Sequence, residues 1–119
     1  MDLINIANEI QRIIKEMNTI RKEIRKRAEA ASLSLSEYRR DLATTIIKLK
    51  NGVELEHEGQ KVINPTATIT LEISRGICYK QKLKADTDDK LYKSALIHLD
   101  NLKTQLTAEQ SLLKYLEVR

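Results

Sequence analysis

The sequence predicts a predominantly α-helical protein, and two observations carry the prediction. Apolar residues recur at alternating steps of three and four near both ends of the chain, as they do in coiled-coil helices. The chain also contains neither Phe nor Trp, so its core must come from Leu, Ile, Ala and four Tyr, a set that suits aliphatic seams between helices. At 119 residues we expect one helical domain with long amphipathic helices at both ends, a shorter central helix, and an irregular segment or small β-hairpin around 53–63.

The first expected element is a heptad helix over residues 1–31. If Ile10 and Met17 are a positions, then Glu9, Glu16 and Glu23 occupy g positions beside the seam, where charges select a partner helix. Isoleucine at both a and d favours three or more strands, or docking on the protein's own helices, over a simple dimer. The predicted oligomer or partner interface is this seam: Leu3, Ile6, Ile10, Ile13, Met17, Ile20 and Ile24.

A second helix is expected over residues 34–51. Ser34 followed by Glu37 forms a capping-box pattern at its start. Lys50, Asn51 and Gly52 supply the basic last turn and the left-handed residue that are typical of a helix end. Between these ends one apolar stripe is predicted, made of Leu35, Tyr38, Leu42, Ile46 and Leu49.

Residues 52–76 are expected to form a loop or hairpin and a short helix. Alternation of apolar and acidic residues over 53–58, before Gly59, fits a short hairpin or an ordered loop. The β-branched alternation of Thr66 to Ile73 has the period of a strand, whereas Asn64 and Pro65 can serve as N-cap and first residue of a helix. We favour the helix, because a lone strand would need a partner that only residues 53–63 could supply.

A last long helix is expected over residues 77–118, with a break near residue 86 left open. Asp86, Asp88 and Asp89 suit a helix start, where negative charge is stabilising. A second heptad seam then continues, interrupted by Glu109 at one inward position. Its apolar members are Tyr92, Ala95, Leu99, Leu102, Leu106, Leu113 and Leu116.

Charge, cysteine content and hydropathy indicate which partners and which cellular location to expect. Lys and Arg total 21 against 17 acidic residues, and the resulting net charge of +4 permits contact with nucleic acid without requiring it. Cys78 is the single cysteine, and the acidic Asp2 does not fit a basic export signal, so we expect an intracellular protein. No window approaches the roughly 18 apolar residues of a membrane-spanning helix, so no membrane partner is expected.

No residue pattern predicts catalysis. His57 and His98 lack the spacing of a zinc site and are expected at the surface or rim, while Cys78 is expected to be a packed thiol. The aspartates at 86, 88 and 89 lack the glycine and glutamate of a calcium loop, and the three glycines are too scattered to cradle a phosphate. We therefore expect no catalytic residues, no metal and no cofactor in a protein that works by binding macromolecules.

Basic residues form the remaining candidate site. Arg21 and Arg25 lie one helical turn apart and can present a cationic face to phosphates, although a solvated flank interleaved with Glu23 and Glu29 remains the alternative. Only Tyr38 and Tyr79 lie beside basic runs, so nucleic-acid binding should be directed at the backbone, sensitive to salt and poorly specific for sequence. The candidates are Arg21, Lys22, Arg25, Lys26, Arg27, Arg39, Arg40, Lys80, Lys82 and Lys84.

Two stretches carry a resemblance: Ser-Glu-Tyr-Arg-Arg-Asp-Leu-Ala at 36–43, running on to Lys-Asn-Gly at 50–52, and Ser-Arg-Gly at 74–76 followed by Lys-Leu-Tyr-Lys-Ser-Ala-Leu at 90–96. This pairing resembles small helical proteins of bacteriophages and prophages over residues 28–116. In length, helix order and basic character it is also similar to the T4-type recombination mediator, a small helical oligomer that loads recombinase on single-stranded DNA. The resemblance implies a role for Arg39, Arg40 and Arg75, and the heptad helix at 3–24 is an extension beyond that family.

We therefore predict a non-enzymatic accessory protein of phage DNA recombination or replication in the cytoplasm of a bacterial host cell. It is expected to form homo-oligomers and to contact single-stranded DNA or a DNA-processing protein. The alternatives are an inhibitor or adaptor that binds a host protein, such as a defence nuclease, and a structural scaffolding protein.

Overall fold

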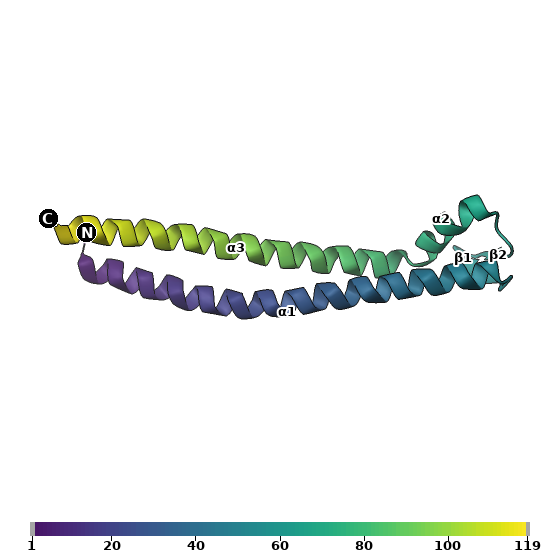
Figure 1. The fold of residues 1–119 in the computed structure, drawn as a ribbon, viewed down its shortest axis with the longest axis horizontal. Helices are drawn as coiled ribbons and strands as arrows, with labels where there is room; N and C mark the ends of the chain where they lie inside the picture. The colour runs from purple at the N-terminus through teal and green to yellow at the C-terminus, as the bar shows by residue number, and fades with distance from the viewer. Residues whose placement is uncertain (1, 119) are drawn as a thin grey trace. The chain divides into compact units, whose positions relative to one another are not determined.

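The computed structural model describes residues 2–118, which form three α-helices and one β-hairpin (Figure 1). The predicted predominance of α-helix, with long helices at both ends, is confirmed. In chain order the elements are α1 (Leu3–Lys50), β1 (Leu55–His57), β2 (Gln60–Val62), α2 (Ala67–Ile77) and α3 (Tyr79–Val118).

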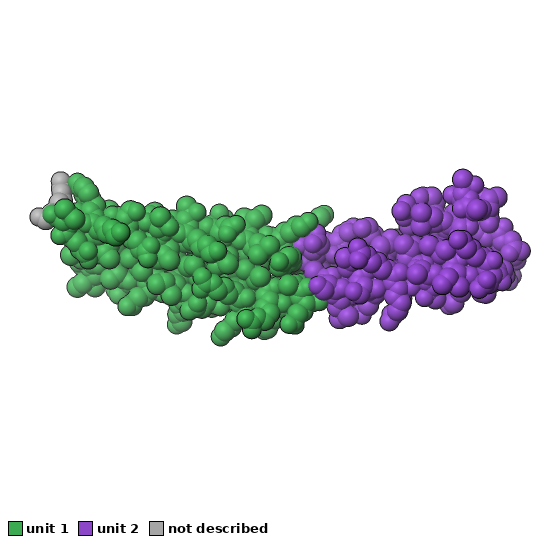
Figure 2. All heavy atoms as spheres, in the orientation of Figure 1, with its two compact units in different colours: residues 1–29, 90–119 green, residues 30–89 purple. Residues whose placement is uncertain are grey.

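These elements divide into two compact units (Figure 2). Unit 1 contains Met1–Glu29 and Lys90–Arg119, and unit 2 contains Ala30–Asp89. The single domain expected from chain length is thus built as two units that share both long helices.

In unit 1, the first part of α1 and the last part of α3 run antiparallel, side by side (Figure 1). Ile13 and Met17 of α1 are buried in one cluster with Leu102 of α3, and Ile20, Leu99 and Leu106 pack against this cluster. The predicted heptad seams therefore meet within one chain. Of the two alternatives for the N-terminal seam, docking on the protein's own helices is the one that the structure shows.

The predicted break between residues 31 and 34 is wrong, because α1 is continuous from Leu3 to Lys50. Ser34, predicted as an N-cap, lies in the helix interior and donates its hydroxyl to the carbonyl of Ala30 at 2.9 Å. It lies three heptads after Ile13, just as Tyr38 lies three heptads after Met17, and all four are buried. One seam therefore continues through α1. Because its inward position at residue 34 holds a polar serine, the apolar pattern in the sequence is interrupted there.

The end of α1 follows the sequence prediction. Gly52 adopts the left-handed conformation with φ of +78°, and its amide donates to the carbonyl of Leu49 at 3.2 Å. The amide of Val53 donates to the carbonyl of Lys48 at 3.0 Å. These two bonds form a Schellman motif, which satisfies carbonyls that the helix end leaves unpaired.

The hairpin interpretation of residues 53–63 is confirmed. β1 and β2 pair antiparallel, with His57 opposite Gln60. The two turn residues between them, Glu58 and Gly59, have φ of 51° and 78°. Positive φ at both central residues defines the type I′ turn, which matches the twist of a two-residue hairpin.

Residues 67–77 form a helix, as favoured, but it begins later than predicted. Thr66 is the N-cap, whereas Asn64 adopts a left-handed φ of 47° and Pro65 precedes the helix. The prediction of Asn64 as N-cap and Pro65 as first helical residue is therefore wrong by two residues. The positive φ turns the chain after β2, so the helix can start only beyond the proline.

The last long helix, expected over residues 77–118, is present as α3 and begins at Tyr79. The possible break near residue 86 is absent, so the three aspartates at 86, 88 and 89 lie within the helix and not at its start. Only Cys78 separates α3 from α2. Lys82 and Asp86 lie one turn apart, and their side chains form an ion pair of 3.1 Å. This pairing, rather than an N-terminal dipole, accommodates the Asp86 charge.

Unit 2 is held by small and polar side chains. Tyr38, Cys78 and Ala85 form its buried apolar cluster, and the Thr45 hydroxyl lies 3.5 Å from the Cys78 sulfur. Ser74 is fully buried and donates its hydroxyl to the carbonyl of Thr70 at 2.7 Å. Since such hydroxyls bond within their own helix, their burial leaves no donor unsatisfied.

Candidate functional site

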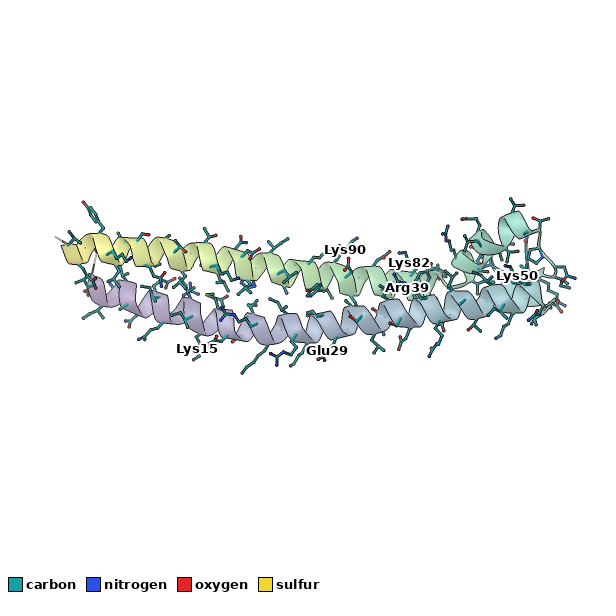
Figure 3. The ribbon with its side chains drawn as sticks, viewed as in Figure 1. Lys15, Glu29, Arg39, Lys50, Lys82 and Lys90 are labelled. Atoms are coloured by element: carbon teal, nitrogen blue, oxygen red, sulfur yellow. The ribbon has the colours of Figure 1, made fainter. Side chains whose placement is uncertain are left out.

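The three helices of unit 2 form a groove of about 580 Å³ that carries three cationic side chains and two tyrosines. We call it the basic groove. Arg39 from α1 and Lys82 from α3 lie close together at this place (Figure 3). The volume lies in the range of ligand-binding pockets, roughly 300–1,000 Å³. The residues that line it are Tyr38, Arg39, Leu42, Arg75, Tyr79 and Lys82.

Helix geometry places each of these groups. Tyr38 occupies an inward position of the α1 seam and is 9% exposed, whereas Arg39, rotated by one residue, is exposed. Tyr79 and Lys82 lie one turn apart at the start of α3. Arg75 stands in the last turn of α2, on the other side of the junction at Cys78. The short connection between α2 and α3 thus brings Arg75 to the same groove.

The three cations differ in how far they are neutralised. The Lys82 ammonium lies 5.5 Å from the centroid of the Tyr38 ring, within range of a cation–π contact, and also pairs with Asp86. Arg75 pairs with the exposed Glu72 at 2.9 Å. Among residues 2–118, Arg39 has no ion-pair partner, so its guanidinium retains its capacity for an anion.

Tyr79 adds an aromatic surface beside these charges. Its side chain is 58% exposed, in contrast to Tyr38, whose ring is packed in the core of unit 2. An exposed ring next to cationic groups can stack on a planar base while the cations contact phosphates. The basic groove can therefore hold a planar, negatively charged ligand. If the ligand is a nucleic acid, these contacts to phosphate and to the face of a base do not depend on the nucleotide sequence.

The basic residues predicted on the first helix lie in unit 1, outside the basic groove. Arg27 is paired with Glu23 at 2.8 Å, and Arg21 donates to the side chain of Asn18 at 3.2 Å. In the described part of the chain, the other three make no ion pair and are exposed: Lys22, Arg25 and Lys26. They form a separate solvated cationic surface.

The remaining predicted cations are distributed around unit 2. Arg40 is 72% exposed and lies 3.4 Å from Asp41, and it does not line the basic groove. Lys80 and Lys84 are exposed on α3 without lining it. Arg39 and Lys82 are thus the two predicted candidates that the fold brings together.

In the sequence, only the family resemblance associates Arg75 with function, and Leu42 belongs only to an apolar stripe. The sequence indicates a functional position for Arg75 only weakly, because that position depends on the helix after Pro65, and the period of Thr66 to Ile73 also fits a strand. Once Thr66 to Ile77 is read as a helix that runs directly into α3, Arg75 and Tyr79 lie one turn apart along a nearly continuous helical path.

The other reactive side chains lie in structural positions. Cys78 is 1% exposed within the unit 2 cluster, as expected of a packed thiol. His57 is half-buried against Gly76, and His98 is half-exposed and lies 3.4 Å from Glu16 of α1. Within residues 2–118, His, Cys, Asp and Glu form no cluster of three or more that could hold a metal ion.

One strong pKa perturbation lies elsewhere, on the exposed face of α1. The Arg12 guanidinium donates hydrogen bonds to Glu9, and these bonds hold the pKa of the Glu9 carboxyl below its ordinary value. The same contact raises the pKa of Arg12. Because Glu9 and Arg12 lie on the surface, one helical turn apart, their ion pair stabilises α1 locally and is not part of a reactive site.

Comparison of the chain with models of protein families, with curated proteins and with solved structures gives no match. In the described chain, no helix combines the length and the apolarity that a membrane crossing requires.

Proposed function

We propose that the protein is a non-enzymatic accessory protein of DNA recombination or replication that contacts single-stranded DNA through the basic groove. The observation that carries this proposal is the convergence of Arg39, Arg75 and Lys82, from three different helices, around the exposed ring of Tyr79. Backbone phosphates would contact the cations, and a base would stack on Tyr79. The resemblance to phage helical proteins supports the same class and a setting in the cytoplasm of a bacterial host cell.

The test is fluorescence anisotropy of a labelled single-stranded oligonucleotide titrated with the protein at two salt concentrations. Three phosphate contacts predict a slope of about −2 in log K against log salt, so affinity should fall about 20-fold between roughly 50 and 200 mM salt. No binding at the lower salt concentration would overturn the proposal.

Neighbouring arginines supply a matched pair of variants. Arg39→Gln removes one lining cation and should weaken binding and flatten the salt slope by about 0.7. Arg40→Gln makes the same chemical change one residue away, outside the groove, and should leave both unchanged. Equal effects of the two variants on binding would show that the basic groove is not the DNA-binding site.

The stacking role of Tyr79 is tested by two substitutions. Tyr79→Ala should lower affinity by about 5- to 150-fold, equivalent to roughly 1–3 kcal/mol, whereas Tyr79→Phe should retain it. If reversal of Arg21, Arg25 and Arg27 to Glu abolishes binding while Arg39→Gln has no effect, DNA binds to the basic segment of α1 in unit 1 and not to the basic groove.

A second candidate function, an adaptor or inhibitor that binds a host protein, is favoured by exposed apolar side chains. Leu33, Ile47 and Leu83 are each about 60% exposed, with values of 60%, 58% and 63%. Exposed apolar side chains of this size are available to pack against a protein partner. Absence of DNA binding in the titration, with a folded chain, would favour this alternative or a scaffolding role.

A further inference from the structure

The α3 helix carries apolar and uncharged residues on two faces, and only one of them packs against α1. The inner face supplies Leu99, Leu102 and Leu106 to the core of unit 1. On roughly the opposite side of the helix, six positions alternate at steps of four and three, carry no charge and are all exposed. We call them the outer stripe: Ile97, Asn101, Thr104, Ala108, Ser111 and Tyr115.

The outer stripe has the character of a contact surface rather than of a solvated flank. In a chain with 32% charged residues it holds none, and its two large members, Ile97 and Tyr115, are 60% and 56% exposed. Thr104 donates its hydroxyl to the carbonyl of Asp100 at 3.1 Å, so it can be buried without an unsatisfied donor. The small residues at the centre would allow a second helix to approach closely.

The exposed area of the chain is large enough to accommodate a contact of this kind. The chain exposes 8793 Å², about a third more than the roughly 6,600 Å² expected for a folded monomer of its mass. The excess, about 2,200 Å², is larger than the roughly 800 Å² that each partner buries in a standard protein interface. A standard interface would therefore cover only part of this excess.

The charged residues beside the outer stripe favour a second copy of this chain as its partner. We propose that the outer stripe binds the outer stripe of a second copy of this chain, antiparallel, with the twofold axis between Thr104 and Ala108. In that register Ile97 faces Tyr115 of the second copy, and Thr104 faces Ala108. The flanking heptad positions, Asp100 and Lys114, then face each other across the dimer twice by symmetry.

A parallel arrangement lacks this complementarity. There Asp100 would face Gln105 and Lys93 would face His98, so no pair of opposite charges would form. In the described chain neither Asp100 nor Lys114 has an ion-pair partner of its own. This contact is separate from the basic groove, which lies in unit 2, and it stands whether or not the protein binds DNA.

The test is sedimentation equilibrium of the full chain, which should give about twice the 13.7 kDa of one copy. Thr104→Glu combined with Ala108→Glu places four carboxylates at the centre of the dimer and should return the mass to that of one copy. Circular dichroism should stay unchanged, because both side chains lie on the face of α3 opposite its core. A wild-type chain that sediments as a monomer at high concentration would overturn the proposal.

Charge exchange tests the register. Lys114→Asp should weaken dimerisation about tenfold, because it sets two like charges against each other twice. Adding Asp100→Lys should restore the original affinity to within about threefold, since the pairs are then reversed. Failure of the double exchange to restore affinity would exclude this antiparallel register.

Lys15→Asp is the matched control for the charge change. Lys15 is exposed on α1 and projects from the side of that helix turned away from α3 (Figure 3). The same reversal of charge there should leave the mass of the assembly unchanged. If Lys15→Asp weakens dimerisation as much as Lys114→Asp does, the second copy binds through net charge and the proposed contact is refuted.

Discussion

The close approach of His57 to Gly76 allows a quantitative test of how the hairpin packs on α2. A Cβ atom added at Gly76 would lie 2.9 Å from Nε2 and 3.1 Å from Cε1 of the His57 ring. Both distances are too short for van der Waals contact, so Gly76→Ala must displace the ring. Displacement removes the contact by which β1 covers the end of α2.

Two opposing free energies set the size of the effect. Alanine in place of glycine near the end of a helix gains about 0.5 kcal/mol of helix propensity. Loss of the His57 packing should cost about 1–2 kcal/mol, as expected for a partly buried side chain forced from its site. We therefore expect Gly76→Ala to destabilise the wild-type chain by about 1 kcal/mol.

A double-mutant cycle separates these terms. In a His57→Ala background the obstruction is gone, so Gly76→Ala should stabilise the chain by about 0.5 kcal/mol. Urea unfolding of the four variants, followed by circular dichroism, should give a coupling energy of about 1.5 kcal/mol. Equal effects of Gly76→Ala in both backgrounds would show that His57 does not pack there, and the reasoning would fail.

Three further predictions concern other parts of the chain. Ile13→Ala should lower the free energy of unfolding in urea by about 2–4 kcal/mol, because Ile13 is 1% exposed. Its neighbour Ile14 is 43% exposed, so Ile14→Ala should lower it by under about 1 kcal/mol. Similar losses of stability in the two variants would contradict the intramolecular seam. Cys78 should react with a thiol reagent at least about a hundredfold more slowly in the native chain than in urea, and fast native labelling would place it at the surface. The pKa of Glu9, followed by NMR, should lie below its ordinary value and rise in Arg12→Gln. Because the folded-state pKa is lowered, the stabilisation from this pair is present at neutral pH and is lost as the pH falls through the folded-state value, and an unchanged Glu9 pKa in the variant would exclude the pairing.

Local sequence patterns determined the helical class and the end of α1, and they indicated the hairpin as one of two possibilities for residues 53–63. Gly52 can adopt positive φ at little cost, and a helix that meets such a residue after a basic turn ends there. The two heptad seams likewise predicted which faces of α1 and α3 are buried, because the period of apolar residues reports the face of a helix directly. All of these features depend on residues that are close together in the chain.

Only the tertiary structure decided where polar residues are buried and which cations meet. Ser34 and Thr45 occupy inward positions of α1, where local rules expect caps or surface, because their hydroxyls bond within the helix and their small size allows neighbouring elements to pack closely. Arg39 lies far from Arg75 and Lys82 in the sequence, and the three meet because α1 packs against the junction at which Cys78 joins α2 directly to α3. Their proximity depends on packing between distant segments, and no local pattern of residue types encodes such packing.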